Sequence, residues 1–324
     1  MYNREELSDL ISKAISNISY DDEAARLMEP VIYIMALGGK RLRPLMTLMS
    51  CNIFSDSSEE ALMPAIAIEL FHNFTLVHDD IMDNADIRRN NPTVHAKWNV
   101  NQAIISGDVM VFLANRYIAQ TPEHCFHKVF ALYNRTAAEV CTGQQMDMDF
   151  ETRSVVGRDD YMRMVELKTA VLIAASMKIG AIIGGAADRD SNLMYEFGRN
   201  LGLAFQIQDD LLDLYSDSAL FGKATGGDIV TNKKTFLLIK ALELAKGDLA
   251  KRLKEQLALR DFDPAEKIGV VRAIYDELGV REIAENLAND YINTAFEHFS
   301  GVSAGSERKQ HLFDLASGLI GRRR

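Results

Sequence analysis

Apolar positions recur every three to four residues along most of the chain, which is the spacing that amphipathic helices show. No segment shows the sustained alternation of a strand. The clearest helical stretches are Glu5 to Ser19, Ala61 to Val77, Gln102 to Ala119, Phe126 to Gln145, Tyr161 to Ala187 and Leu193 to Leu214. The pattern therefore predicts an all-α protein.

Glycine and proline residues separate these stretches, but no Pro- or Ser-rich linker divides the chain. We therefore predict one domain over residues 1–324, a large helical bundle around a central cavity. Ala170 to Ala187 is apolar enough to suggest a membrane span. It carries Ser176 and Lys178 and is rich in Ala and Gly, so we interpret it as a buried, closely packed helix and expect no membrane span.

Composition narrows the function only by exclusion. The formal charge of −10 argues against a nucleic-acid partner, which requires a basic face. The three cysteines, Cys51, Cys125 and Cys141, have no paired spacing, so neither a disulfide framework nor a zinc site is expected. The polar start of the chain lacks the basic and apolar regions of a signal peptide, which predicts a cytoplasmic location.

Two acidic segments, Asp79 to Asp83 and Asp209 to Asp213, share the spacing D-D-x-x-D at the ends of apolar helical stretches. Residues four apart lie on one helix face, so each segment presents a pair of like charges in one direction. Such pairs need a cation, and carboxylates without His or Cys suit Mg²⁺, which also binds phosphate oxygens. We predict a metal-bridged phosphate site in which the two segments face each other across the cavity mouth.

Cations near these segments could hold the anion. Lys40, Arg41 and Arg43 follow a Gly38-Gly39 turn. Arg88 and Arg89 follow the first acidic segment, and Lys168, Lys223 and Lys233 lie at expected helix or loop boundaries. A single Lys or Arg is usually a solvated surface charge, so only the combination indicates an anion site.

Separated motifs also match one known family in order and spacing. They are Gly38-Gly39-Lys40-Arg41-Leu42-Arg43-Pro44, His72 to Asp83 with Arg88-Arg89, Lys168-Thr169, Phe205-Gln206 with Asp209-Asp210 and Asp213, and Lys223 to Lys233. On these residues the chain resembles the trans-isoprenyl diphosphate synthases of the polyprenyl synthetase family. The resemblance implies the all-helical isoprenoid synthase fold and a homodimer.

The resemblance also implies a reaction. This family joins isopentenyl diphosphate to an allylic diphosphate, such as dimethylallyl, geranyl or farnesyl diphosphate, and releases pyrophosphate. Mg²⁺, with three ions per active site, assists ionisation of the allylic substrate. The departing pyrophosphate takes the final proton, so no side-chain base is expected.

Residue roles follow from the same resemblance. Asp79 and Asp83 on one side and Asp209 on the other are implied Mg²⁺ ligands, with Asp80, Asp210 and Asp213 as supporting or water-mediated ligands. The residues implied to hold the allylic diphosphate are Arg88, Lys168 with Thr169, Gln206, Lys223 and Lys233. Those implied to hold isopentenyl diphosphate are Lys40, Arg43, His72 and Arg89. Asp79, Asp83, Asp209, Lys168 and Lys233 are the implied catalytic residues.

Product length is implied by the residues four and five positions before the first aspartate, which in this family form the floor under the growing chain. Here they are Thr75 and Phe74. One small and one bulky residue resemble the pattern of the geranylgeranyl (C20) synthases, and the farnesyl (C15) product is the alternative. Helix periodicity places His72, Thr75, Leu76, Asp79 and Asp83 on one face, which would line the cavity.

Other interpretations stay open from sequence. Glu69-x-x-His72 matches half of a di-iron site, although no second Glu-x-x-His is present. For Asp147, Asp149 and Glu151 we favour solvation of a helix end over metal binding. A terpene cyclase and a non-catalytic synthase subunit are the alternative functions.

The sequence also suggests mobile parts. The polar segments Asn84 to Asn99 and Ser216 to Lys234 are expected to be mobile and to close over the diphosphates. The Arg322 to Arg324 terminus is expected to be a frayed tail, and the alternative is that it folds over the isopentenyl diphosphate site.

Overall fold

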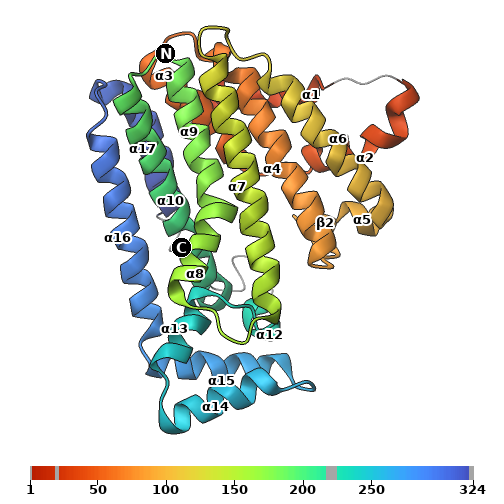
Figure 1. Cartoon of the computed structure of the whole chain (residues 1–324), viewed down its shortest axis with the longest axis vertical. Coiled ribbons are helices and arrows are strands. Elements are labelled where there is room, and N and C mark those ends of the chain that lie inside the picture. The colour runs from red at the N-terminus through yellow and green to blue at the C-terminus, as the bar shows by residue number, and fades with distance from the viewer. Residues whose placement is uncertain (1, 19–21, 217–224, 321–324) are drawn as a thin grey trace. The chain divides into compact units, whose positions relative to one another are not determined.

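The computed structural model describes residues 2–18, 22–216 and 225–320, and its regular structure is almost entirely helical (Figure 1). The prediction of an all-α protein is thus confirmed. The first half contains α1 (Arg4–Ser16), α2 (Ala25–Ala36), α3 (Leu42–Phe54), α4 (Leu62–Met82), α5 (Val94–Lys97), α6 (Val100–Ile118) and α7 (Phe126–Thr152). The second half contains α8 (Arg158–Val165), α9 (Val171–Ile183), α10 (Asp188–Tyr215), α12 (Gly227–Val230), α13 (Phe236–Leu244), α14 (Gly247–Ala258), α15 (Pro264–Glu277), α16 (Val280–Ser300) and α17 (Ser306–Ile320).

The chain folds into two compact units. Unit 1 comprises Met1–Ala137, Leu172–Tyr195 and Gly301–Ser317, and unit 2 comprises Ala138–Val171, Glu196–Ser300 and Gly318–Arg324. Neither unit is a continuous segment, and both α7 and α10 run through the two units. A single domain over the whole chain stays a prediction.

Helix α4 forms the core of unit 1, where it packs against α3 and α6. Its residues Ile66, Ile68 and Leu70 are completely buried. Within the described residues, Ser58–Met82 is the one helical segment long and apolar enough to cross a bilayer. An 18-residue window within it has a mean hydropathy of 1.2, and 61% of that window is buried. The core helix of a globular unit has the same composition, so the hydropathy alone is weak evidence for a membrane span.

Helix α9 confirms the prediction of a buried, closely packed helix. Residues 171–177 are all buried. A Cβ atom added at Gly180 would lie 2.0 Å from the Thr47 carbonyl oxygen, and one at Gly184 would lie 2.7 Å from the Cys51 carbonyl oxygen. Only glycine therefore allows the backbones of α9 and α3 to approach this closely.

The stretch predicted from Tyr161 to Ala187 is helical but is not one regular helix. Between α8 and α9, Glu166–Ala170 forms a π-helical turn. Added Cβ atoms at Gly143 on α7 and Gly202 on α10 would lie 2.3 Å from Lys168 N and 2.6 Å from Ala170 Cα. The neighbouring helices therefore pack against the backbone of this turn, which carries Lys168 and Thr169. Single π turns occur frequently at functional sites.

The segment Asn84 to Asn99 was expected to be a mobile polar loop, but it forms regular structure. Strands β1 (Ile87–Arg88) and β2 (Asn91–Pro92) pair antiparallel, and α5 follows. The two turn residues, Arg89 and Asn90, have φ values of 51° and 61°, as a type I′ turn requires. The Tyr33 hydroxyl donates to the Pro92 carbonyl at 2.7 Å and ties the hairpin to α2. Closure over a diphosphate stays a prediction.

Unit 2 contains α8, most of α10, and α12 to α16 around a separate apolar core. Tyr161, Ile207, Phe236, Leu253 and Ile274 belong to this core. Figure 1 shows α14 and α15 side by side, and α15 also contacts α12. This packing places α12 and the start of α13 beside the second acidic segment on α10.

Candidate functional site

The predicted site residues fall into two groups, one in each unit. Unit 1 holds Lys40, Arg43, His72, Phe74, Thr75, Asp79, Asp80, Asp83, Arg88 and Arg89. Unit 2 holds Lys168, Thr169, Gln206, Asp209, Asp210, Asp213 and Lys233. Lys223 and the Arg322 to Arg324 tail lie outside the described residues. The two acidic segments belong to different units, so their facing each other across a cavity stays a prediction.

The face of α4 predicted to line the cavity is partly exposed, as are the neighbouring residues Phe74 and His78. Its members His72, Thr75, Leu76, Asp79 and Asp83 all keep some exposure. In contrast, Asn73, Val77 and Asp80 are buried on another side of the helix. The first acidic segment therefore divides into Asp79 and Asp83 on the more exposed face and Asp80 in the interior.

Asp80 binds Arg88. Arg88 Nε donates to both Asp80 carboxylate oxygens, at 2.8 and 2.9 Å, and Nη2 lies 2.7 Å from Oδ1. The same Nη2 lies 3.9 Å from Asp79 Oδ2. Burial alone would lower the pKa of the Arg88 guanidinium, but Asp80 outweighs it and raises that pKa. Asp80 thus holds a permanent positive charge next to Asp79.

The Gly38-Gly39 turn approaches Arg89. Arg89 Nη1 donates to the Gly38 carbonyl, and a Cβ added at Gly39 would lie 2.9 Å from Arg89 Cζ. Gly39 also has a φ of 122°, which L side chains rarely adopt. In the structure the turn makes room for the guanidinium of Arg89. It brings Arg89 to the segment that continues into Lys40 and Arg43.

Arg43 and His72 form a partly buried, hydrogen-bonded pair. Arg43 Nη1 lies 3.1 Å from His72 Nε2, and because a guanidinium can only donate, the imidazole nitrogen accepts. Burial, followed by the charges of Arg43, Arg89 and Arg88, lowers the pKa of His72 well below 6.5, so the ring is neutral. Burial lowers the pKa of Arg43 to about 10, which leaves it charged at neutral pH. Arg43 Nε is buried and has no hydrogen-bond partner within the described residues.

Glu69 lies beneath these cations and is 4% exposed. Asn73 Nδ2 donates to its Oε1 at 3.0 Å. Burial raises the pKa of the Glu69 carboxyl, while Asn73 and Arg43 oppose that shift. Among the described residues, no group of three or more His, Cys, Asp or Glu could hold a metal ion by itself.

Phe74 and Thr75 lie one turn before Asp79. The Phe74 ring centroid is 5.5 Å from that of Phe71 and 4.8 Å from that of His78. Thr75 Oγ1 donates to the His72 carbonyl at 2.7 Å. Phe74 therefore belongs to an aromatic cluster on the helix that carries the first acidic segment.

In unit 2, Asp210 is the buried member of the second acidic segment. Its carboxylate accepts hydrogen bonds from the Tyr161 hydroxyl, from Gln206 Nε2 at 3.1 Å and from the Phe236 backbone N–H at 3.2 Å. Burial raises the pKa of Asp210 to about 6, although these donors oppose the shift. Asp210 thus ties α8, α10 and the start of α13 together, whereas Asp209 is exposed.

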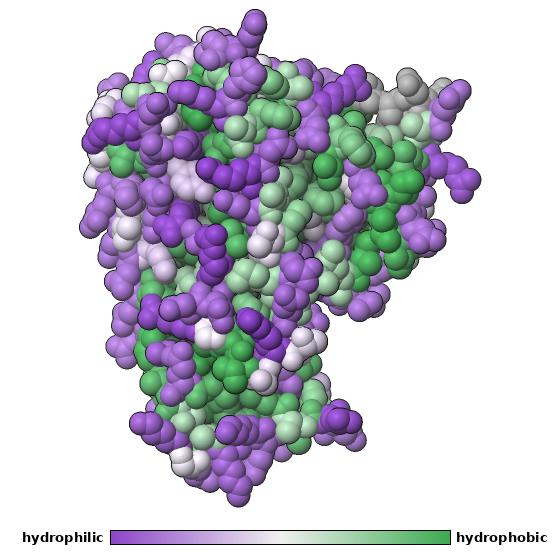
Figure 2. Space-filling view, viewed as in Figure 1, coloured by the Kyte–Doolittle hydropathy of each residue, from purple (hydrophilic) through white to green (hydrophobic). Residues whose placement is uncertain are grey.

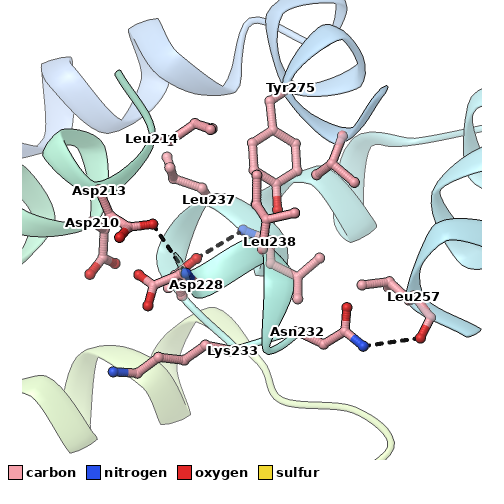
Figure 3. A pocket seen from close by; sticks show the side chains of 13 residues that line it. Asp210, Asp213, Leu214, Asp228, Asn232, Lys233, Leu237, Leu238, Leu257 and Tyr275 are labelled. Carbon is pink, nitrogen blue, oxygen red and sulfur yellow. Dashed lines mark hydrogen bonds between the residues drawn. The ribbon is translucent and has the colours of Figure 1, made fainter. Parts of the chain in front are cut away.

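Asp213 and Asp228 hold the segment from Asp228 to Lys233 (Figure 3). Asp213 Oδ2 accepts from the Asp228 backbone N–H at 3.1 Å, and the Asp228 carbonyl accepts from the Lys233 N–H at 2.8 Å. Burial raises the pKa of the Asp228 carboxyl to about 7, although Lys233 opposes the shift. Together these contacts place Lys233 close to the second acidic segment.

Lys168 on the π turn lines a pocket together with Lys233. Its Nζ is 2.6 Å from Asp147 Oδ2, and Thr169 Oγ1 donates to Gln206 Oε1 at 3.2 Å. A pocket with an empty volume of about 330 Å³ is lined by Asp147, Tyr161, Met164, Val165, Lys168, Thr169, Gln206, Asp210, Lys233, Lys234 and Thr235. The structure thus brings Lys168, Thr169, Gln206 and Lys233 together, as the motifs predicted.

Sequence reasoning missed several residues of this group. The preference for solvation is wrong for Asp147, which binds Lys168, while Asp149 and Glu151 are exposed as that interpretation required. Tyr161 and Asp228 were not singled out. Tyr161 lies two helical turns before Lys168, on the same predicted helix, which is a weak signal that it lies near the site. Asp228 follows a Gly-Gly pair, which is a weak signal of a turn beside the second acidic segment.

Comparison with known proteins extends these observations to the whole chain. The family model described as polyprenyl synthetase matches residues 24–278. A geranylgeranyl diphosphate synthase of Sulfolobus acidocaldarius is 38% identical over 305 residues, covering 93% of this chain and 90% of that protein. A geranylfarnesyl diphosphate synthase of Natronomonas pharaonis is 34% identical and covers 98% of this chain and 96% of that protein.

Solved structures agree with the sequence relatives. The crystal structure of a geranylgeranyl pyrophosphate synthase is 41% identical and matches with a TM-score of 0.94 over 100% of both chains. The expected isoprenoid synthase fold is thereby confirmed. Because both the family model and the relatives cover most of the sequence, the chain belongs to the polyprenyl synthetase family of prenyltransferases.

Proposed function

We propose that this protein is a short-chain trans-prenyltransferase that condenses isopentenyl diphosphate with an allylic diphosphate, with the C20 diphosphate as its main product. One observation carries the proposal. In each unit, a D-D-x-x-D segment presents partly exposed carboxylates while its second aspartate, Asp80 or Asp210, is buried and holds neighbouring site residues in place. Such an arrangement suits a metal-bound diphosphate more than a structural role.

We assign the donors to the two substrates as the family resemblance implies. Arg88, Lys168, Thr169, Gln206, Lys233 and Lys223 would hold the allylic diphosphate. Lys40, Arg43, His72 and Arg89 would hold isopentenyl diphosphate. The buried Arg43 Nε, which lacks a protein partner among the described residues, supports the second assignment, because a buried donor without an acceptor is costly and a phosphate oxygen would satisfy it.

The carboxylates fit Mg²⁺. Asp79, Asp83 and Asp209 supply hard oxygen atoms, and since no described cluster could hold a metal alone, water and diphosphate oxygens would complete the shell. Mg²⁺ bound there would stabilise the charge on the leaving pyrophosphate as a Lewis acid. Asp80, Asp210 and Asp213 would be supporting or water-mediated ligands. The number of three ions follows from the family resemblance.

The side chains supply the remaining steps. Arg88, Lys168 and Lys233 would neutralise the leaving diphosphate oxygens, so that the allylic carbon–oxygen bond breaks heterolytically. Isopentenyl diphosphate held near Arg43 and Arg89 would then attack the allylic cation, and the cavity would exclude water that could trap the cation. Pyrophosphate would accept the proton released on forming the new double bond.

Product length would be limited by Phe74. Its packing against Phe71 and His78 restrains the ring, which supports a floor beneath the growing chain. The names of the relatives include both geranylgeranyl and geranylfarnesyl diphosphate synthases, so the C20 assignment needs a direct test.

A homodimer is the proposed assembly, and α6 supports it. Ile104, Ile105 and Phe112 are 42%, 50% and 71% exposed. Figure 2 shows apolar side chains gathered over the start of this helix. A second copy of the chain would cover such a face. The cytoplasmic location stays a prediction.

The decisive experiment is incubation of the purified protein with Mg²⁺, labelled isopentenyl diphosphate and each allylic starter in turn, followed by product sizing. We expect C20 product that depends on both substrates and disappears with EDTA. Pyrophosphate release from an allylic substrate alone would indicate a cyclase. No turnover with any starter would indicate a non-catalytic subunit.

A further inference from the structure

Lys267, in the first half of α15, is a fully enclosed lysine. Its residue exposure is 1%, which makes it one of the largest completely buried side chains described. Lysine is almost never fully buried unless its charge has partners. The partners therefore indicate what the residue does.

The ammonium group of Lys267 contacts neutral groups. Nζ lies 2.7 Å from Asn232 Oδ1 and 3.4 Å from the Val230 carbonyl oxygen, and it sits 4.2 Å above the centroid of the Phe262 ring. No ion pair joins it to a carboxylate within residues 225–320 or the other described segments. Both oxygen contacts go to the short segment that leads into Lys233.

Asn232 is held from two sides. Its Oδ1 accepts from Lys267 on α15, while its Nδ2 donates to the Leu257 carbonyl on α14 at 3.1 Å (Figure 3). Its φ of 56° is in the left-handed region, which asparagine adopts more readily than most residues. Lys267 therefore stabilises a backbone conformation that would otherwise be unfavourable.

That conformation sets the course of the next residues. The N–H of Lys233 bonds to the Asp228 carbonyl, and the Lys233 carbonyl accepts from Thr235 N–H at 2.9 Å. Phe236 N–H then reaches the buried Asp210. A change at Asn232 would thus alter both the direction of Lys233 and the start of α13.

We propose that Lys267 is a positioning residue that, through Asn232, fixes Lys233 for binding the allylic diphosphate. The inference rests on the proposed function, because Lys233 matters only if a diphosphate binds beside it. Lys267 itself is enclosed and touches no substrate. Its effect would therefore be confined to the substrate that Lys233 holds.

The test is Lys267→Met, which keeps an unbranched side chain one heavy atom shorter and removes the charge and the donors. We expect the KM for the allylic diphosphate to rise about tenfold, with the KM for isopentenyl diphosphate unchanged. A non-hydrolysable allylic thiolodiphosphate should bind about tenfold more weakly by calorimetry. Lys254→Met, an exposed lysine on α14, is the matched control and should change neither value.

A double-mutant cycle decides whether the effect passes through Lys233. In a Lys233→Ala background, Lys267→Met should add little to the loss of affinity, since residues that act through one contact are not additive. Additive losses, or an equal rise of both KM values, would overturn the proposal. Asn232→Ala should reproduce the selective loss and serves if Lys267→Met does not fold.

The two proposals fail differently. If the wild-type protein forms no product, the proposed function is wrong, and the calorimetric comparison still tests Lys267. If the wild-type protein is active and Lys267→Met binds the allylic analogue normally, only the positioning role is wrong.

Discussion

At the scale of single residues, neighbouring aspartates of one motif have opposite surroundings. Asp79 keeps a fifth of its side chain exposed, whereas Asp80 is 1% exposed and bonded to Arg88. Asp209 and Asp210 differ in the same way. The aspartates of one motif thus have two different environments, which supports the proposed division between carboxylates that bind a metal and carboxylates that orient the site.

This difference predicts opposite phenotypes for adjacent substitutions. Asp80→Asn should lower the free energy of unfolding by about 2 kcal/mol, less than the roughly 3–5 kcal/mol of a fully buried pair, since a quarter of Arg88 is exposed. Asp79→Asn should lower kcat roughly 100-fold with little change in stability. Thermal melting and steady-state kinetics check both. Equal destabilisation by the two variants would contradict the assignment.

Phe74 allows a prediction about specificity. Phe74→Ala should shift products beyond C20, because removing the ring opens space below the allylic site. Chromatography of the dephosphorylated products measures the shift. Phe313→Ala, which removes an exposed ring on α17, is the control. An unchanged product profile for Phe74→Ala would remove this residue from the proposed floor.

At the scale of elements, glycines decide how closely helices approach the site. Gly143 on α7 and Gly202 on α10 both face the backbone of the π turn that carries Lys168. Side chains at these positions would push the turn away, and Lys168 with it. The position of Lys168, which we propose to bind the allylic diphosphate, thus depends on two glycines that pack against its backbone.

Gly143→Ala tests this dependence. The new Cβ would meet Lys168 N at 2.3 Å and Leu167 C at 2.7 Å, so the backbone must shift. Overpacking of this kind costs roughly 1–3 kcal/mol, and we expect a higher KM for the allylic substrate as well. Gly318→Ala on α17 has open space around it and should lower neither stability nor activity. Wild-type kinetics for Gly143→Ala would contradict the argument.

At the scale of the whole molecule, the exposed face of α6 predicts assembly. Replacing Ile105 and Phe112 together by Glu should convert a dimer to monomers, because the charges could not be buried in an apolar interface. Light scattering after size-exclusion chromatography measures the mass. Leu242→Glu on α13, at 43% exposure, is the control and should leave the dimer intact. A monomeric wild-type protein would refute the proposed dimer.

Much of the fold and site could be predicted from local sequence. Helical periodicity gave the fold class, because the repeat depends on a few neighbouring residues. The motifs predicted that Lys168, Thr169, Gln206 and Lys233 act together, and these four residues line one pocket. Solvation of Asp147 was wrong because its partner, Lys168, lies 21 residues away and reaches it only through the packing of α7 on the π turn.

By itself, the sequence determined that the chain is helical and where its carboxylates and cations lie along those helices, since periodicity and spacing are local properties. Only the tertiary structure decided which aspartates are buried and what holds them. Asp210 accepts hydrogen bonds from the Tyr161 hydroxyl and the Phe236 N–H, which lie 49 and 26 residues away in the sequence. Lys267 bonds to Asn232 over a sequence separation of 35 residues. Burial and hydrogen bonding of a polar group depend on such distant partners, which no local pattern records.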